Sequence, residues 1–388
     1  MKITAVEISG FKGINELVVH PRKINLIVGK NNTGKTSILQ AIYWALEKNM
    51  FKIQASAYNS HISSFINVNM KESRVVIKSA EENRYFVLSK PELKEILGEF
   101  KKDLIERLKE SVPHVNKNAW EKAEEMLDKI LVKNEVFSEI ERESISIETG
   151  KEKANLFSYT PQILEHIEPF LDYIDKDISR TGHGFVKFVI TRPSFSHIRA
   201  NEKEEKISAM INNLLVTERT KMSLNKSKIN EIQKYLQRRK IVENLERFDF
   251  DMLLFKENGK EYEIPYSFMG DGFKALIGLI ARTSLASKII LIEEPETHMH
   301  PAYIAEVIRQ IIDFSIVNNA QFFITTHSSD VLDIVTSDRL EPAYQDYLTK
   351  ELNIIRVDRL DDSIVSQELD RKMATAELED LKLDLRGL

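Results

Sequence analysis

The first fifty residues alternate between strand and helix patterns. Apolar side chains recur at alternate positions in Lys2–Ser9, and Ile14–His20 has a pattern that suits a neighbouring strand. Lys23–Val28 is a short apolar run, which predicts a buried strand. In Thr36–Leu46 the apolar side chains share one helical face, at Ile38, Leu39, Ile42 and Leu46. The segment therefore predicts two paired strands, a third strand, a loop and a helix.

The middle of the chain has a highly charged helical pattern. Pro91–Leu108 and Ala119–Val132 place apolar residues at helical spacing, with charged residues on the other side. Asn201–Phe248 is also charged and helical in pattern, whereas Phe185–Thr191 is an apolar run typical of a strand. We therefore predict a helix-rich insertion over 91–248 that carries one strand of the neighbouring domain near 185–191.

The last third returns to alternating elements. Asn258-Gly259 lies between two short apolar runs, and this dipeptide is a strong hairpin signal because it tolerates positive φ at both turn positions. Beyond it, apolar runs typical of strands alternate with helical patterns, at Asp271–Ala286, Lys288–Ile292, Ala302–Phe314 and Gln321–Thr325. The expected fold is α/β: a head with a mixed β-sheet and flanking helices, built from residues 1–90 and 249–388 and interrupted by the insertion.

Composition narrows the class of protein. Glycine and proline make up only 23 of the 388 residues, which favours long helices. The net charge of −5 excludes a uniformly basic nucleic-acid binder, and the absence of cysteine excludes disulfides, thiolate metal sites and cysteine nucleophiles. The longest apolar run, Ala275–Ala281, is far too short to span a membrane, so we expect a soluble, cytoplasmic protein without membrane contact.

A phosphate-binding loop is the clearest chemical signal. Gly29–Thr36 fits the spacing G-x-x-x-x-G-K-[ST], preceded by an apolar strand and followed by an amphipathic helix. In such a loop backbone N–H groups surround the phosphates, the lysine adds charge near the β- and γ-phosphates, and the hydroxyl binds Mg²⁺. The candidate nucleotide-binding residues are Gly29, Lys30, Asn31, Asn32, Thr33, Gly34, Lys35, Thr36 and Ser37.

Two carboxylates end the apolar run that starts at Ile289. A buried strand would carry Glu293 and Glu294 to the carboxyl edge of the sheet, where ligands bind in open α/β folds. Glu293 suits a magnesium ligand together with Thr36, and Glu294 suits polarisation of the attacking water. The alternative is a surface pair of glutamates at the end of a strand.

Two further polar turns follow the same logic. His327 ends the strand Phe322–Thr326, where a histidine can sense the γ-phosphate; the alternative is a capping or core histidine. Ser267–Gly272 is a Ser/Gly-rich turn before a helix, which can bind phosphate or simply cap the helix.

These residues together resemble the ABC-type ATPases, and among them the OLD and SMC/RecF-like branch. The motif E-E-P-E-x-H-L-H-P of OLD-type proteins is similar to Glu293–Pro301, with Glu293 standing where ABC proteins at large have Asp. The other segments that carry the resemblance are Ile8–Lys12, Gly29–Ala41, Ser267–Gly272 (the signature motif) and Thr326–Ser328 (the switch histidine). Phe188–Ser194, at the place of the Q-loop, contains no glutamine.

The resemblance implies a mechanism and a partner. Two heads would sandwich two molecules of ATP with Mg²⁺, forming a homodimer or a higher homo-oligomer that closes on binding and opens on hydrolysis. The catalytic residues would be Glu294, His327 and Lys35. The signature residues acting on the partner's nucleotide would be Ser267, Gly270, Asp271 and Gly272.

A basic stretch is the best candidate for contact with nucleic acid. Glu218–Lys240 has eight basic and two acidic residues, a local net charge of +6. The basic residues are Arg219, Lys221, Lys226, Lys228, Lys234, Arg238, Arg239 and Lys240. The alternatives are a solvated helical arm and a surface that binds a protein partner.

The sequence predicts no nuclease of its own. OLD-family nucleases carry a C-terminal Toprim domain, whereas only 53 residues follow Val335, and Asp358, Asp361 and Asp362 lack the upstream glutamate motif. Glu293–Pro301 resembles the extended Walker B motif and D-loop of OLD-type ATPases. Structural roles are therefore favoured over a metal site for Glu296, His298 and His300.

The preferred interpretation is a stand-alone ATPase that switches a separately encoded effector or nuclease, similar to the ATPase subunits of split antiphage defence systems. A RecF/SMC-like clamp on duplex DNA in DNA repair and an ATP-gated scaffold with negligible turnover are the alternatives.

Overall fold

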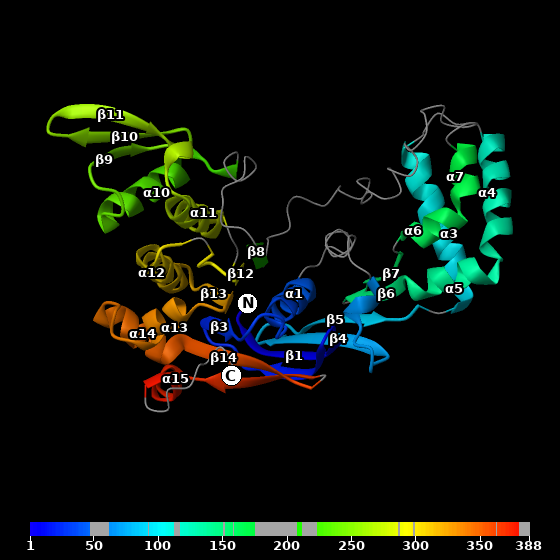
Figure 1. Cartoon of the computed structure of the whole chain (residues 1–388), viewed down its shortest axis with the longest axis horizontal. Helices are drawn as coiled ribbons and strands as arrows, with labels where there is room; N and C mark the ends of the chain where they lie inside the picture. Colours follow the sequence, from blue (N-terminus) through cyan, green and yellow to red (C-terminus); the bar gives the residue numbers. More distant parts are fainter. Residues whose placement is uncertain are drawn as a thin grey trace.

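The described chain is built from two six-stranded sheets and one three-stranded sheet, with helices packed around them (Figure 1). The structure is a computed structural model. It describes residues 1–46, 62–91, 93–111, 117–149, 152–157, 159–174, 208–211, 223–285, 288–297, 299–361 and 363–379.

One six-stranded sheet carries the strands that lead to the candidate site. Its strands are β3 (Ile24–Val28), β8 (Ser208–Ile211), β12 (Ile289–Glu293), β13 (Gln321–Thr326), β14 (Leu352–Leu360) and β15 (Ser363–Leu369). They lie in the order β15-β14-β3-β13-β12-β8, and every pair is parallel except β14 with β15. The central strands β3 and β13 are buried throughout because helices and the second sheet cover both of their faces.

The second six-stranded sheet is antiparallel throughout. Its strands are β1 (Ile3–Phe11), β2 (Ile14–Val19), β4 (Glu72–Ser79), β5 (Arg84–Ser89), β6 (Ser144–Thr149) and β7 (Glu152–Phe157), in the order β2-β1-β4-β5-β6-β7. Alternate residues of β1 and β4 are buried, as expected for strands with one face on a core. The expected pairing of Ile14–His20 with the first strand is confirmed.

Helix α1 (Lys35–Leu46) lies between the two sheets and contacts strands of both. Its Trp44 packs against the rings of Phe11, Phe65 and Phe86, with ring centroids 5.8, 4.8 and 5.4 Å apart. Leu291 of β12 faces this same core, whereas its neighbour Ile290 belongs to the core on the other side of the sheet. This core fixes the helix that follows the phosphate-binding loop.

Helices from the C-terminal half cover the other face of the parallel sheet (Figure 1). They are α11 (Asp271–Leu285), α12 (Pro301–Asn318), α13 (Ser329–Thr336), α14 (Pro342–Glu351) and α15 (Arg371–Glu379). The sequence patterns Asp271–Ala286 and Ala302–Phe314 predicted the first two of these helices within a few residues at the ends that the structure describes.

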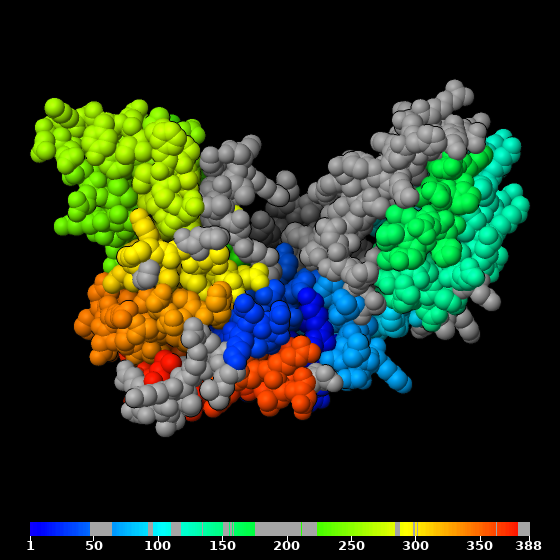
Figure 2. Space-filling view, viewed as in Figure 1, coloured from blue at the N-terminus to red at the C-terminus, as the bar shows by residue number. Residues whose placement is uncertain are grey.

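Two further groups of elements project from opposite ends of the sheets. One is a three-stranded sheet, β9 (Leu245–Phe248), β10 (Met252–Glu257) and β11 (Lys260–Pro265), packed on helix α10 (Lys226–Arg239). The other is a helical group with its own apolar core: α3 (Leu93–Ser111), α4 (Lys117–Leu131), α5 (Asn134–Arg142), α6 (Pro161–His166) and α7 (Glu168–Tyr173). In the space-filling view the first group is green at the left and the second teal to green at the right, with blue α1 between them (Figure 2).

The region expected to be helical departs from that expectation in three places. Ser208–Ile211 forms β8, which pairs in parallel with β12, and Leu245–Phe248 forms β9, so the helical pattern over Asn201–Phe248 is wrong there. Residues within 91–248 also supply β6 and β7 to the antiparallel sheet. The expected strand near 185–191 lies outside the described residues, as does Phe188–Ser194.

The predicted hairpin is confirmed. Glu257 of β10 pairs with Lys260 of β11, and Asn258 and Gly259 both have positive φ, at +52° and +78°. Among the described residues, no helix has the length and apolar character needed to cross a membrane.

Candidate functional site

The loop Gly29–Thr36 joins β3 to α1, as the sequence predicted. Asn32 and Gly34 have positive φ, at +63° and +92°, which turns the chain back toward the helix. A Cβ on Gly29 would lie 2.3 Å from the carbonyl oxygen of Val357, so glycine is required by the close approach of β14. The loop is therefore shaped both by its own glycines and by the strand beside it.

The Lys35 side chain closes over the loop. Its ammonium donates hydrogen bonds to the carbonyl oxygens of Gly29 and Lys30, at 2.8 and 2.7 Å. Burial lowers the pKa of Lys35, and the negative charges of Glu294, Glu296 and Glu293 oppose that shift. The lysine is thus held at the loop by bonds that an incoming phosphate can replace.

The predicted magnesium ligands lie in contact. The Thr36 hydroxyl donates a hydrogen bond to the Glu293 carboxylate, although 257 residues separate them in sequence. Both are oxygen ligands of the kind that Mg²⁺ prefers, and Mg²⁺ commonly binds through one or two protein oxygens plus substrate phosphates and water. Within the described residues no group of three His, Asp or Glu side chains is placed to hold a metal ion by itself. His298 lies outside the described residues.

Glu294 and His327 form a direct pair. The Nδ1 atom of His327 lies 3.0 Å from the Glu294 carboxylate. An ionised carboxylate only accepts hydrogen bonds, so the tautomer of His327 that bonds to it is the one with N–H at Nδ1. Glu294 has φ +43°, an uncommon value for a residue other than glycine. Its backbone is held there by hydrogen bonds with Thr325 and Thr297.

Glu296 holds His327 of this pair in position. Its side chain is buried at 6% exposure and accepts hydrogen bonds from the Thr326 hydroxyl at 2.5 Å and the His327 backbone N–H at 3.3 Å. Burial raises the pKa of Glu296, and the hydrogen bonds from Thr326 and His327 partly oppose that shift. Glu296 therefore positions the residue that contacts Glu294.

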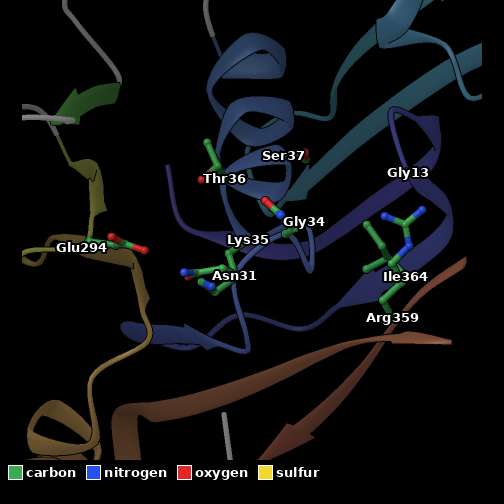
Figure 3. A pocket seen from close by; sticks show the side chains of 10 residues that line it. Gly13, Asn31, Gly34, Lys35, Thr36, Ser37, Glu294, Arg359 and Ile364 are labelled. Carbon is green, nitrogen blue, oxygen red and sulfur yellow. The ribbon is translucent and has the colours of Figure 1, made fainter. Parts of the chain in front are cut away.

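A cavity of about 570 Å³ lies over the loop. In Figure 3 Glu294 stands at one end, Lys35 and Asn31 lie in the middle, and Arg359 and Ile364 stand at the other end. The lining residues are Gly13, Asn31, Asn32, Gly34, Lys35, Thr36, Ser37, Glu294, Arg359 and Ile364. Six of the predicted nucleotide-binding residues thus line one cavity together with Glu294.

Sequence reasoning missed the far end of this cavity. Arg359 and Ile364 come from the β14–β15 hairpin, which is absent from the elements that the sequence predicts. Asp358 lies within β14, and Asp362 lies outside the described residues. Alternating apolar residues in Leu352–Leu360, followed by Asp361 and a second alternating run, were the signal available.

The predicted signature residues lie on an exposed turn. A short 3-10 helix, Tyr266–Phe268, precedes α11, and the side chain of Lys274 donates to the Ser267 carbonyl oxygen at 2.8 Å. Gly270 and Asp271 are exposed, Gly272 is half-buried, and none of these residues lines the cavity of their own chain.

The predicted basic surface is smaller than expected. Arg219 and Lys221 lie outside the described residues. Lys226, Lys234, Arg238 and Lys240 are exposed on α10 or at its end, and Lys228 is half-buried and pairs with Glu231.

Arg239 does not belong to that basic surface. Its guanidinium lies 3.0 Å from Asp313, 3.6 Å from Glu306 and 3.7 Å from Glu341. These carboxylates hold the side chain between α10, α12 and α14, which corrects its assignment as a nucleic-acid contact.

Comparison with known proteins identifies relatives of this chain. A family model described as an AAA ATPase domain matches residues 1–332. An ATP/GTP phosphatase of Helicobacter pylori is 24% identical over 353 residues, covering 86% of this chain and 87% of that protein. The DNA replication and repair protein RecF of Nitrosococcus oceani is 34% identical over 79 residues, or 20% of each chain. An uncharacterised protein of Methanocaldococcus jannaschii is 36% identical over its whole length and 31% of this chain.

Solved structures of SMC heads align with nearly the whole chain. The SMC head domain from Thermotoga maritima aligns with a TM-score of 0.45 and 12% identity, covering 95% of this chain and 99% of that one. An Smc head domain with an extended coiled coil, bound to a domain of ScpA from Pyrococcus furiosus, aligns with a TM-score of 0.45 and 14% identity, covering 98% and 99%.

Proposed function

The chain belongs to the AAA ATPase domain family and is an ATPase, and we propose that it hydrolyses ATP with Mg²⁺ in the cavity over Gly29–Thr36. The observation that carries this assignment is the meeting of two distant pairs at one cavity. Thr36 contacts Glu293 at the phosphate-binding loop, and His327 contacts Glu294 beside it. A cavity of about 570 Å³ is within the range of small-molecule sites.

The roles follow from the geometry. Thr36 and Glu293 would hold Mg²⁺, which when bound would neutralise charge on the β- and γ-phosphate oxygens. Lys35 would exchange its bonds to the loop carbonyls for bonds to phosphate. Glu294 would accept a hydrogen bond from the attacking water, while His327, placed by Glu296, orients the Glu294 carboxylate.

We further propose that two heads share each nucleotide. The segment Ser267–Gly272 lies outside the cavity of its own chain, and Phe268 within it is 80% exposed. An apolar ring so exposed beside the first turn of α11, whose N–H groups have no partner within the helix, suits contact with a second copy of the chain. Opening and closing of this dimer would then switch an effector, and we favour the OLD-like branch and an antiphage role for it.

Duplex DNA as the trigger is the second candidate. It is favoured by the exposed basic residues of α10 and by the similarity to RecF over one fifth of the chain. The ATP-gated scaffold without turnover is the least favoured, because Glu294 is present and paired with His327.

Steady-state hydrolysis tests the site. Lys35→Ala should abolish measurable ATP binding, whereas Glu294→Gln should retain binding and lose about 10²- to 10⁴-fold in turnover. Glu257→Gln, at an exposed hairpin position, is the matched control and should behave like the unmodified chain. Full turnover by Glu294→Gln would contradict its assignment as the residue that activates water. Stimulation of the unmodified chain by duplex DNA would favour the DNA-triggered alternative over a protein trigger.

A mixing experiment tests the shared site. Lys35→Ala and Ser267→Arg should each be inactive alone, because each removes one half of every composite site. In an equal mixture about half of the dimers pair one chain of each kind and regain one intact site, so activity should return to about a quarter of the unmodified value. No recovery on mixing would show that the signature residues act within their own chain or not at all.

A further inference from the structure

The β14–β15 hairpin forms the end of the cavity that lies opposite Glu294 (Figure 3). Arg359 and Ile364 are direct partners across the two strands, so their side chains share one face of the hairpin. That face is turned to the phosphate-binding loop, since a Cβ on Gly34 would lie 2.4 Å from Cδ1 of Ile364. The hairpin is thus a wall of the nucleotide cavity and not only an edge of the sheet.

Ile364 supplies an apolar surface at this wall. Its side chain is buried at 3% exposure against the core that also contains α1. The same Cδ1 atom would lie 3.2 Å from a Cβ on Gly13, the turn residue between β1 and β2. The isoleucine therefore holds the hairpin against two glycines that border the cavity.

Arg359 supplies an uncompensated positive charge. Among the described residues no carboxylate lies within ion-pair distance of it, and its hydrogen bond is a 3.4 Å contact from Nε to the Asp361 carbonyl oxygen. Arg356, three residues earlier on β14, instead pairs with Glu377 at 3.0 Å and Asp358 at 3.2 Å. One strand thus carries a neutralised arginine and an exposed one, and the exposed one lines the cavity.

The two ends of the cavity differ in the chemistry they offer. Thr36, Glu293 and Lys35 fix the triphosphate beside Glu294, if the proposed function holds. The nucleoside must then extend away from Glu294, toward the hairpin. A planar guanidinium stacks on a base or donates to the acceptor atoms of a base and ribose.

We propose that Arg359 binds the nucleoside end of the nucleotide and distinguishes a nucleotide from bare polyphosphate, while the buried Ile364 holds the hairpin that carries Arg359 against Gly34 and Gly13. This inference rests on the proposed function. It assigns to the C-terminal hairpin a part of the substrate site that lies outside the phosphate-binding loop, both glutamates and the switch histidine.

Calorimetric titration with two ligands shows whether Arg359 binds the nucleoside or the phosphates. A non-hydrolysable ATP analogue and inorganic tripolyphosphate, each with Mg²⁺, are titrated into the whole chain. Arg359→Ala should weaken the analogue about 10- to 100-fold, the loss expected for a charged hydrogen-bonding or stacking group, and leave tripolyphosphate unchanged. Arg359→Lys should lose an intermediate amount, because it keeps the charge without the planar group. Arg247→Ala, an arginine 62% exposed on β9, is the control.

Two outcomes overturn the inference. Equal weakening of both ligands would make Arg359 a phosphate ligand, and no weakening of either would remove it from the site. The proposed function itself fails if the unmodified chain binds neither ligand. It also fails if Lys35→Ala binds both ligands as tightly as the unmodified chain does. The two failures are therefore distinguishable. Because Arg359 is exposed, its variants should retain the urea midpoint of the unmodified chain, which the same samples can show.

Discussion

Replacement of Gly34 by alanine should destabilise the chain through two separable terms. Gly34 has φ +92°, which an L-residue adopts at a cost of about 1–2 kcal/mol. The new Cβ would also lie 2.4 Å from Cδ1 of Ile364, and overpacking of this kind costs about 1–3 kcal/mol. The free energy of unfolding should therefore fall by about 2–5 kcal/mol in total, a large share of what a domain normally has.

Two other variants isolate these terms. Gly259 has φ +78° and nothing within 4 Å of the added Cβ, so Gly259→Ala should show the backbone cost alone. Ile364→Val deletes the one atom in the close contact and by itself should cost about 0.5–1.5 kcal/mol. In the double variant of Gly34→Ala with Ile364→Val, the overpacking term should disappear. The double variant should therefore be about 1–3 kcal/mol more stable than the sum of the two single changes would give.

Urea unfolding followed by tryptophan fluorescence measures these changes in the free energy of unfolding in the core that contains Ile364. The chain has two tryptophans, and Trp44 is buried in the same core as Ile364. Trp120 belongs to the core of the projecting helices, so a Trp120→Phe background leaves Trp44 as the reporter of the head. The midpoint then gives the change in stability, provided that the slope with urea is unchanged.

The reasoning fails on either of two results. If Gly34→Ala costs no more than Gly259→Ala, the hairpin does not press on the loop. If Ile364→Val recovers nothing in the double variant, the close contact lies elsewhere, and Ile364 cannot be the wall of the nucleotide cavity.

Three further predictions concern charged groups. Burial raises the pKa of Glu296 above its usual 4.5, so the folded chain keeps a proton that the unfolded chain releases, and stability should fall as pH rises above that value. Glu296→Gln should flatten this fall in urea midpoints measured up to about pH 8, and an unchanged profile would contradict it. Arg239→Ala should lower the unfolding free energy by about 1–3 kcal/mol, because Asp313 and Glu306 lose the guanidinium that lies between them, and should not change DNA binding. Reversal of charge at Arg238 and Lys240 should leave stability unchanged and weaken DNA binding if DNA is a ligand, as salt-dependent filter binding would show.

Local patterns predicted the elements that surround the loop. Alternation in Lys2–Ser9, the apolar run Lys23–Val28 and the helical face of Thr36–Leu46 each describe an element that buries one side or both, and all three formed. Asn258-Gly259 predicted its hairpin because few dipeptides accept positive φ twice. Such signals depend on neighbours in sequence, so the sequence contains them in full.

The failures have a common physical cause. β8 is four residues long, and its partner β12 lies 81 positions further along, so no period within the segment distinguishes it from a helix. Arg239 looks like its neighbours Arg238 and Lys240 in the sequence, yet it faces Asp313 and Glu306 from another helix. Both outcomes were decided by tertiary contacts.

The site itself depends on the register of the parallel sheet. Val28 at the end of β3 pairs with Thr326 of β13 on one side and Arg356 of β14 on the other, and Thr325 of β13 pairs with Glu293 of β12. The carboxyl ends of β3, β12 and β13 therefore lie on one line with Arg356 of β14, and Glu294 and Arg359 follow that line by one to three positions. Side chains alternate along a strand, so a slip of one residue would turn Glu293 or Arg359 to the opposite face. The buried runs of β3, β12 and β13 fix that register, so the apolar core determines which polar groups can meet. The motif residues form one site because each motif follows the end of one of these strands.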